Sequence, residues 1–227
     1  MAAADSVRSD PLRASEPLIE RMLARLAMHG PSTTPSRFPD SSSRTAYYIN
    51  AHNLMLLAEL EGVLVSRTAG RWPPTSMNAG RWTIDGVEET VFTLQAKAIG
   101  ESANDWRVRM ALFSGRRDGP ALWPRIILGD MLDVQLDEIT RAALASPRVV
   151  VIDHGLDKRL LLCEELFAIQ SELVADYERR LKTRGASILN VLLEWATPFN
   201  RETLNSAVGY AVAKLPRDAR LPVSTVP

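Results

Sequence analysis

A mostly apolar stretch, residues 44 to 60, constrains the fold more than any other part of the chain. It reads Arg-Thr-Ala-Tyr-Tyr-Ile-Asn-Ala-His-Asn-Leu-Met-Leu-Leu-Ala-Glu-Leu and has the composition of a buried helix. Asn is a mediocre helix former and is costly to bury without hydrogen-bond partners. Asn50 and Asn53 stand three positions apart and share a helix face. The stretch therefore predicts a hub helix whose amides are met by other segments.

The polar side chains of the hub helix allow two interpretations. Asn50 and Asn53 are candidate ligand-binding residues, and the alternative is that their amides satisfy backbone groups of loops that cross the helix. His52 lies on a different azimuth from Asn50 because adjacent helical positions do not share a face. It is interpreted as a rim residue, with a general base as the alternative.

Composition excludes several classes of partner and site. The 27 basic and 27 acidic residues cancel, so no global charge favours nucleic acid or an anionic membrane, and we expect neither as a partner. Cys163 is the single cysteine, which rules out an intrachain disulfide and fits a reducing compartment. No run approaches the roughly 20 apolar residues of a membrane span. We expect a cytoplasmic protein, with no cofactor and, from three scattered histidines, no metal site.

Hydrophobic periodicity predicts an α+β fold, a helix-rich single domain with a small antiparallel or mixed sheet. Residues 1–14 are predicted to be a flexible tail, 15–43 an N-terminal helix and linker, 44–199 the α+β domain, and 200–227 a C-terminal helix and tail. A short strand and turn is predicted at 82–86, and strands are predicted at 106–113 and 148–153. Further helices are predicted over 94–99 with Thr93 as its cap, after Asp130, and over 164–182, 187–196 and 200–214.

The segment Ser114–Pro120, here called the site loop, is the strongest candidate for binding. Arg116 and Arg117 stand near glycines, and guanidinium groups match phosphate or carboxylate. The alternative is that these arginines are solvated or paired with acids such as Asp118. Trp72, in a loop with repeated Gly-Arg-Trp, is expected to plug the same region.

Ser114 is also a candidate nucleophile, because it follows a predicted strand and precedes a glycine. His154 or His52 would then be its base. The full Gly-x-Ser-x-Gly elbow is missing, since Leu112 occupies the place of the first glycine. The alternative is that Ser114 is a turn residue.

The order of these pieces resembles the bacterial and plant family known as domain of unknown function 547. The matching segments are Ala46-Tyr-Tyr-Ile-Asn-Ala-His-Asn-Leu54, Pro74-Thr-Ser-Met77, Thr93-Leu94, Arg109-Met-Ala-Leu-Phe-Ser-Gly-Arg-Arg-Asp-Gly-Pro-Ala-Leu122 and Leu132-Asp-Val-Gln-Leu-Asp-Glu138. The resemblance runs from about residue 44 to about residue 199.

The chain departs from the family pattern where that pattern carries reactive groups. The family has Ile-Glu-His in the short helix, a His at the start of the strand, and Asn-Cys followed by Ser in the loop. Here the helix reads Lys97-Ala-Ile99, the strand offers Arg109, and the loop gives Phe113-Ser114. A thiol-based site needs a thiolate, an imidazole and an orienting group. The resemblance therefore implies a diverged member that has lost this route.

The sequence supports three hypotheses of function. The favoured one is a non-catalytic protein that binds a small anionic ligand or a protein partner through the site loop, Asn50, Asn53 and Trp72. The second is a hydrolase or acyltransferase that uses Ser114. The third is a structural module whose C-terminal helices assemble it into a homo-oligomer.

Overall fold

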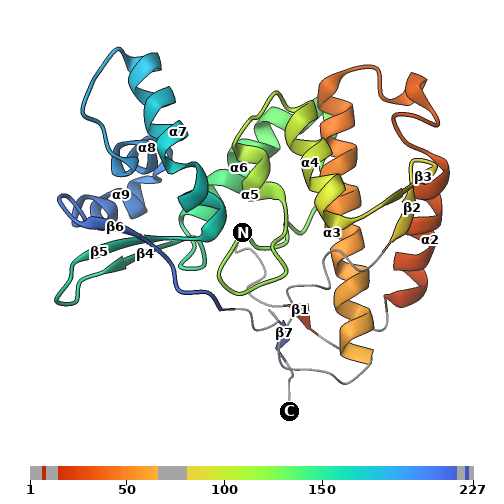
Figure 1. Cartoon of the computed structure of the whole chain (residues 1–227), viewed down its shortest axis with the longest axis horizontal. Helices are drawn as coiled ribbons and strands as arrows, with labels where there is room; N and C mark the ends of the chain where they lie inside the picture. The colour runs from red at the N-terminus through yellow and green to blue at the C-terminus, as the bar shows by residue number, and fades with distance from the viewer. Residues whose placement is uncertain (1–6, 9–14, 66–80, 219–222, 225–227) are drawn as a thin grey trace.

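The computed structural model of the protein describes residues 7–8, 15–65, 81–218 and 223–224. Helices dominate and the strands form small sheets, which confirms the predicted α+β class (Figure 1). In chain order the helices and strands are β1 (Val7–Arg8), α2 (Glu16–Met28), α3 (Ser41–Val65), β2 (Trp82–Ile84), β3 (Val87–Glu89), α4 (Val91–Glu101), α5 (Arg107–Ala111), α6 (Leu132–Leu144), β4 (Val150–Asp153), β5 (Arg159–Leu162), α7 (Glu164–Leu181), α8 (Ile188–Trp195), α9 (Pro198–Asn205), β6 (Ala211–Lys214) and β7 (Val223–Ser224).

The largest sheet in the described part of the chain is mixed, as expected. β4 pairs antiparallel with β5, and β6 lies parallel to the other side of β5. β2 and β3 form a separate hairpin whose turn, Asp85-Gly86, has positive φ at both residues, the geometry of the tight turns that suit hairpins. β1 and β7 bring the two ends of the chain together in a short parallel pair.

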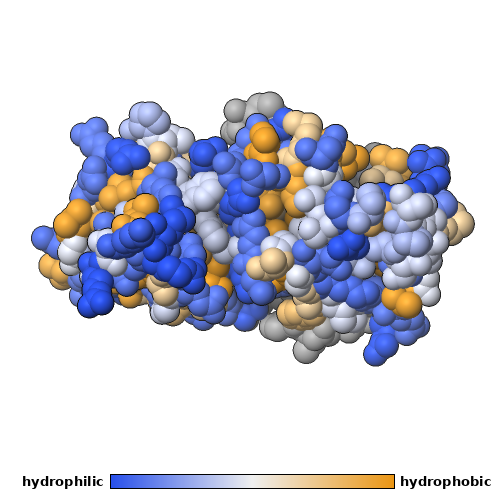
Figure 2. All heavy atoms as spheres, turned by 90° about the horizontal axis from the view of Figure 1, so that it is seen from above, coloured by the Kyte–Doolittle hydropathy of each residue, from blue (hydrophilic) through white to orange (hydrophobic). Residues whose placement is uncertain are grey.

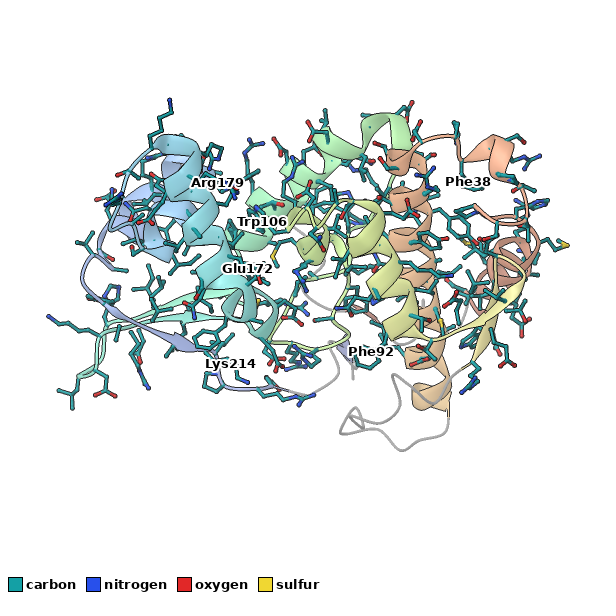
Figure 3. The ribbon with its side chains drawn as sticks, turned by 45° about the horizontal axis from the view of Figure 1, so that its top comes forward. Phe38, Phe92, Trp106, Glu172, Arg179 and Lys214 are labelled. Carbon is teal, nitrogen blue, oxygen red and sulfur yellow. The ribbon has the colours of Figure 1, made fainter. Side chains whose placement is uncertain are left out.

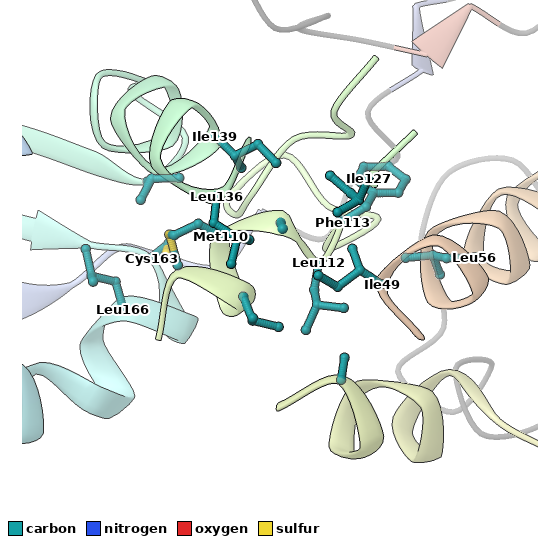
Figure 4. Packing of buried hydrophobic residues seen from close by; sticks show 14 of the residues in the cluster. Ile49, Leu56, Met110, Leu112, Phe113, Ile127, Leu136, Ile139, Cys163 and Leu166 are labelled. Carbon is teal, nitrogen blue, oxygen red and sulfur yellow. The ribbon is translucent and has the colours of Figure 1, made fainter. Parts of the chain in front are cut away.

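The hub helix is α3, and it lies between α2 and α4 in the right half of the view in Figure 1. Asp40 caps its first turn, accepting a hydrogen bond from the Ser43 N–H at 2.7 Å. In Figure 4, Leu112, Phe113 and Ile127 lie beside Ile49 of α3, and Met110, Leu136 and Cys163 extend the same buried cluster toward α7. The helix thus organises the core from which the other elements take their positions.

The predicted strand over 106–113 is wrong, because these residues form the short helix α5 followed by an extended segment. The Asp105 carboxylate accepts a hydrogen bond from the Arg107 N–H at 2.9 Å and starts the turn. Val108 and Ala111 are then buried one turn apart. A run of five residues that alternates in polarity does not distinguish a strand from a single helical turn.

The predicted helix over 200–214 is also wrong in its second half. α9 begins at Pro198 behind the Thr197 cap and ends at Asn205, and Gly209 at φ 79° leads into strand β6. Thr93 is not the cap of α4 either: Thr90 is the cap, and Thr93 is its partner three residues on in a capping box. The predicted strand at 148–153 is confirmed as β4.

Two features of the structure concern contact with a membrane: the distribution of hydrophobic residues over the surface, and the length and composition of the helices. Seen from above, hydrophobic residues lie in separate patches among hydrophilic ones (Figure 2). No helix in the described ranges combines the length and the apolar character that a membrane crossing requires.

Candidate functional site

Asn53 joins α3 to the segment that enters the site loop. Its Nδ2 donates to the Ala111 carbonyl at 3.0 Å, and its Oδ1 accepts from the Phe113 N–H at 2.9 Å. Both backbone groups lie at the end of α5, where the chain leaves the helix and has no helical partner for them. The Asn53 amide therefore replaces hydrogen bonds that secondary structure does not supply.

Asn50 does the same for a second crossing segment. Its amide donates to the Ile127 carbonyl at 2.8 Å and accepts from the Ile127 N–H at 3.0 Å. The interpretation of the two hub amides as partners of crossing backbone is therefore confirmed. The hydrogen bonds of both amides are made with the protein itself.

The site loop is a buried, internally bonded turn packed against α3. Its ends are joined by the Ser114 N–H, which donates to the Pro120 carbonyl at 3.1 Å. Gly115 has φ 67° and faces Leu56 of α3, and a Cβ at Gly119 would lie 2.6 Å from the Ser114 Oγ. The structure thus brings the site loop and the hub helix together, and glycine is required at both positions.

Arg116 is not an open anion site. It is only 7% exposed, and its guanidinium pairs with Asp118 at 3.0 Å and with Glu165 at 2.8 Å. Glu164 lies 3.7 Å from the same group. The paired alternative is therefore the correct one for Arg116, which serves as the charged anchor between the site loop and α7.

A cavity of about 360 Å³, here called the His52 cavity, opens beside the site loop. The walls of this cavity come from α3, α4, α5, the site loop and α7. Phe92 lines the cavity, and Figure 3 shows it on the same lower edge of the molecule as Lys214. The lining residues are His52, Phe92, Gln95, Arg109, Leu112, Phe113, Ser114, Arg116, Glu164, Glu165, Ala168 and Arg217. This volume is at the lower end of small-molecule sites.

His52 is buried at 1% exposure, so its interpretation as a rim residue is wrong. Its Nδ1 lies 3.0 Å from the Asn53 Oδ1. That oxygen also accepts from the Phe113 N–H, which fixes the orientation of the amide, so Nδ1 must carry the proton. Nε2 forms no hydrogen bond within the described ranges. His52 lines the cavity, and its Nε2 is available as a hydrogen-bond acceptor.

Burial also fixes the charge of His52. Loss of hydration lowers the pKa of the imidazole to about 4, and the hydrogen bond to Asn53 opposes this only in part. The ring is consequently neutral at physiological pH. Its Nε2 favours a donor such as a hydroxyl and disfavours an anionic oxygen at the same point.

Cationic charge in the His52 cavity comes from Arg109 and Arg217. Arg109 is half-buried on α5, Arg217 is exposed after β6, and neither has an acidic partner among the residues described. The two glutamates that line the cavity both approach Arg116, and Glu164 also contacts Lys214 at 3.4 Å. A guanidinium that lines a cavity without a counter-ion is suited to a carboxylate or phosphate.

Several predicted site residues lie elsewhere. Arg117 is exposed and does not line the His52 cavity, although its N–H donates to the Asp218 carbonyl at 3.3 Å. His154 is exposed after β4 and lies 2.9 Å from the Tyr210 hydroxyl, outside the cavity that Ser114 lines. Asn50 lines a different cavity. Trp72 falls outside the described residues.

Ser114 lines the cavity together with His52, but no hydrogen bond joins them. Its hydroxyl donates to the Pro120 carbonyl at 3.2 Å and accepts from the Arg116 N–H at 3.3 Å. Both contacts lie within the site loop, as expected for a turn residue. The described residues also contain no cluster of His, Cys, Asp and Glu arranged to hold a metal ion.

Sequence reasoning did not select Arg109 and Arg217, which both line the His52 cavity. The sequence places Arg109 in a strand, where its side chain would alternate with its neighbours. The signal that singles it out is its place in the resemblance, where the family pattern has a His. Arg217 carries no signal in the sequence, because it reaches the cavity only through the pairing of β6 with β5.

Comparison of the chain with models of protein families, with curated proteins and with solved structures found no match.

Proposed function

We propose that the protein binds a small molecule that carries a carboxylate or phosphate group and a hydroxyl, in the His52 cavity. The observation that carries the proposal is Arg109, a half-buried guanidinium with no acidic partner among the described residues. The anionic group would pair with Arg109 and the hydroxyl would donate to the His52 Nε2. The site would therefore require an anionic group at one end of the ligand and a hydrogen-bond donor at the other, which gives it selectivity.

The proposal describes a diverged, non-catalytic member of the family that the sequence resembles. Two of the polar groups around the cavity are held by partners: Asn53 orients His52, and Arg116 is paired with Asp118 and Glu165. Such preorganisation favours binding of a rigid small ligand. A reducing, cytoplasmic location is proposed with it, because the one cysteine is a buried thiol.

The test is thermal unfolding with a panel of glycolate, lactate, citrate, glycerol phosphate and inorganic phosphate. Ligand at a hundred times its Kd stabilises a protein by about 2.7 kcal/mol, which for a chain of this size raises Tm by roughly 5 to 10 °C. We expect at least one hydroxy acid or hydroxylated phosphate to do so. Arg109→Gln should remove most of that increase.

Arg117→Gln is the matched control, because Arg117 is an exposed arginine outside the cavity. It should leave the ligand-induced increase in Tm unchanged. A panel that stabilises neither protein, or an increase that survives in Arg109→Gln, would remove the proposal. Stabilisation that is equal for inorganic phosphate and glycerol phosphate would remove the role of the hydroxyl.

The rival function is tested at Ser114. Because the hydroxyl proton is directed to a backbone carbonyl and not to an imidazole, we expect an activated fluorophosphonate probe to leave the folded protein unlabelled. Mass spectrometry of the intact chain measures this directly. Labelling that disappears in Ser114→Ala would instead establish a nucleophile.

A further inference from the structure

A further cavity among the described residues lies on the opposite wall of α3. This space, here called the Trp123 cavity, has a volume of about 660 Å³ and is lined by residues of α2 and α3, by the segment 122–129, and by Arg37 and Phe38 ahead of α3. Asn50 and Asn53 face it, whereas their neighbour His52 lines the other cavity. The two cavities share a helix but no lining residue. The proposal for the Trp123 cavity therefore does not rest on the one for the His52 cavity.

The lining of the Trp123 cavity is almost wholly apolar. Its side chains are mainly aliphatic and aromatic, including Met22, Leu26, Phe38, Tyr47, Leu54, Leu57 and Trp123. Ile126 and Leu128 stand at the same cavity and are 62% and 46% exposed. Exposed apolar side chains beside an apolar cavity mark a surface that a partner molecule covers. The volume is that of a drug-sized or lipid-sized ligand.

Charge at this cavity has one sign only. Its charged lining residues are Arg25, Arg37 and Arg125, with no acidic residue among the residues that line it. Arg125 pairs with Glu138 at 2.6 Å and lies over the Trp123 ring. Arg25 and Arg37 are exposed, and neither has an ion-pair partner within the described ranges. Two guanidinium groups are thus available beside an apolar space.

Trp123 adds a polar group that has no partner. Its Nε1 is buried and donates to no acceptor in the described part of the structure. A buried indole N–H in a folded protein usually finds an acceptor. Because the nitrogen itself is closed off from the cavity as well as from solvent, it is not a contact for a ligand there.

We propose that the Trp123 cavity binds a monomeric single-chain amphiphile with an anionic head, a fatty carboxylate. The chain would occupy the apolar space between α2 and α3, and the carboxylate would lie against Arg25 and Arg37. Charge complementarity selects the head, because no acidic side chain lines the cavity to attract a cation. The apolar lining selects the tail.

Calorimetric titration of the full chain with dodecanoate below its micelle concentration tests the proposal. Dodecyltrimethylammonium has the same tail and the opposite charge. Comparing the two affinities therefore separates the contribution of the head group from that of the tail. We expect dodecanoate to bind at least about tenfold more tightly, the equivalent of one favourable charge contact. The double variant Arg25→Gln, Arg37→Gln should lose about the same factor for dodecanoate only.

Arg21→Gln is the matched control, since Arg21 is exposed on α2 but does not line the cavity. It should bind dodecanoate like the wild type. Equal affinity for the two amphiphiles, or an unchanged affinity in the double variant, would overturn the proposal. The proposal would also be overturned if the protein sedimented with anionic phospholipid vesicles but did not bind dodecanoate. The site would then recognise a membrane surface and not a monomeric amphiphile.

Discussion

We expect Asn53→Ala to be the most damaging single substitution of a polar side chain in this protein. It removes three hydrogen bonds and leaves the Ala111 carbonyl, the Phe113 N–H and the His52 Nδ1 without partners. Each buried group left unpaired costs about 1 to 3 kcal/mol, so the free energy of unfolding should fall by about 3 to 5 kcal/mol. That is a large part of the total stability of a typical domain.

Urea unfolding at pH 7.5 measures the effect. Asn50→Ala unpairs two groups of one residue at a half-buried position, and we expect a smaller loss of about 1 to 3 kcal/mol. Asn205→Ala is the control, because Asn205 is exposed at the end of α9, and it should change stability by no more than about 0.5 kcal/mol. Equal losses of unfolding free energy in the three variants would show that the hub amides have no special role in stability.

We expect the second large effect in the dependence of stability on pH. Burial holds the pKa of His52 at about 4, below the 6.5 of the unfolded chain. Between these values the unfolded chain binds a proton that the native state does not, so the free energy of unfolding falls as pH falls. At about 1.4 kcal/mol per unit, His52 alone should contribute a loss of about 3 kcal/mol between pH 7 and pH 4.

The variant His52→Gln isolates this contribution. Carboxylates make both proteins acid-sensitive, but the difference between their stabilities should shrink steadily from pH 6.5 to pH 4 and stay constant above pH 7. Asn205→Ala, at an exposed position, should keep the wild-type slope. Parallel curves for wild type and His52→Gln would mean that the imidazole is hydrated in the native state.

The sequence predicted the helices better than the strands. The hub helix, α7, α8 and β4 all lie within a few residues of their predicted bounds, because long periodic stretches and caps are local signals. α5 and β6 were predicted with the wrong type, because a run of four or five residues fits either period and its tertiary neighbours decide the outcome. For β6, that neighbour is β5, about fifty residues earlier in the chain.

The same limit explains what the sequence revealed of the site. Amides in an apolar helix must be paired, so the need for crossing partners was predictable, and Asn50 and Asn53 meet it. The burial of His52 was not predictable. Its position around the hub helix does not show which face of that helix α4 and the site loop cover. The pairing of Arg116 with Glu165 depends on α7 approaching the loop, which no local pattern records. Arg109 was visible in the sequence only through its place in the resemblance, and its position at the cavity depends on α5 being a helix.

The most direct measurement is the ¹⁵N NMR spectrum of the three histidine side chains during titration with the hydroxy acid or phosphate that stabilises the protein most. His52→Gln assigns the resonance. We predict that His52 starts with Nδ1 protonated and Nε2 bare, and that ligand shifts the Nε2 signal as it accepts a hydrogen bond while Nδ1 keeps its proton. In Arg109→Gln the shift should require far more ligand. An Nε2 signal that does not move at saturating ligand, or that carries a proton from the start, would contradict binding in the His52 cavity.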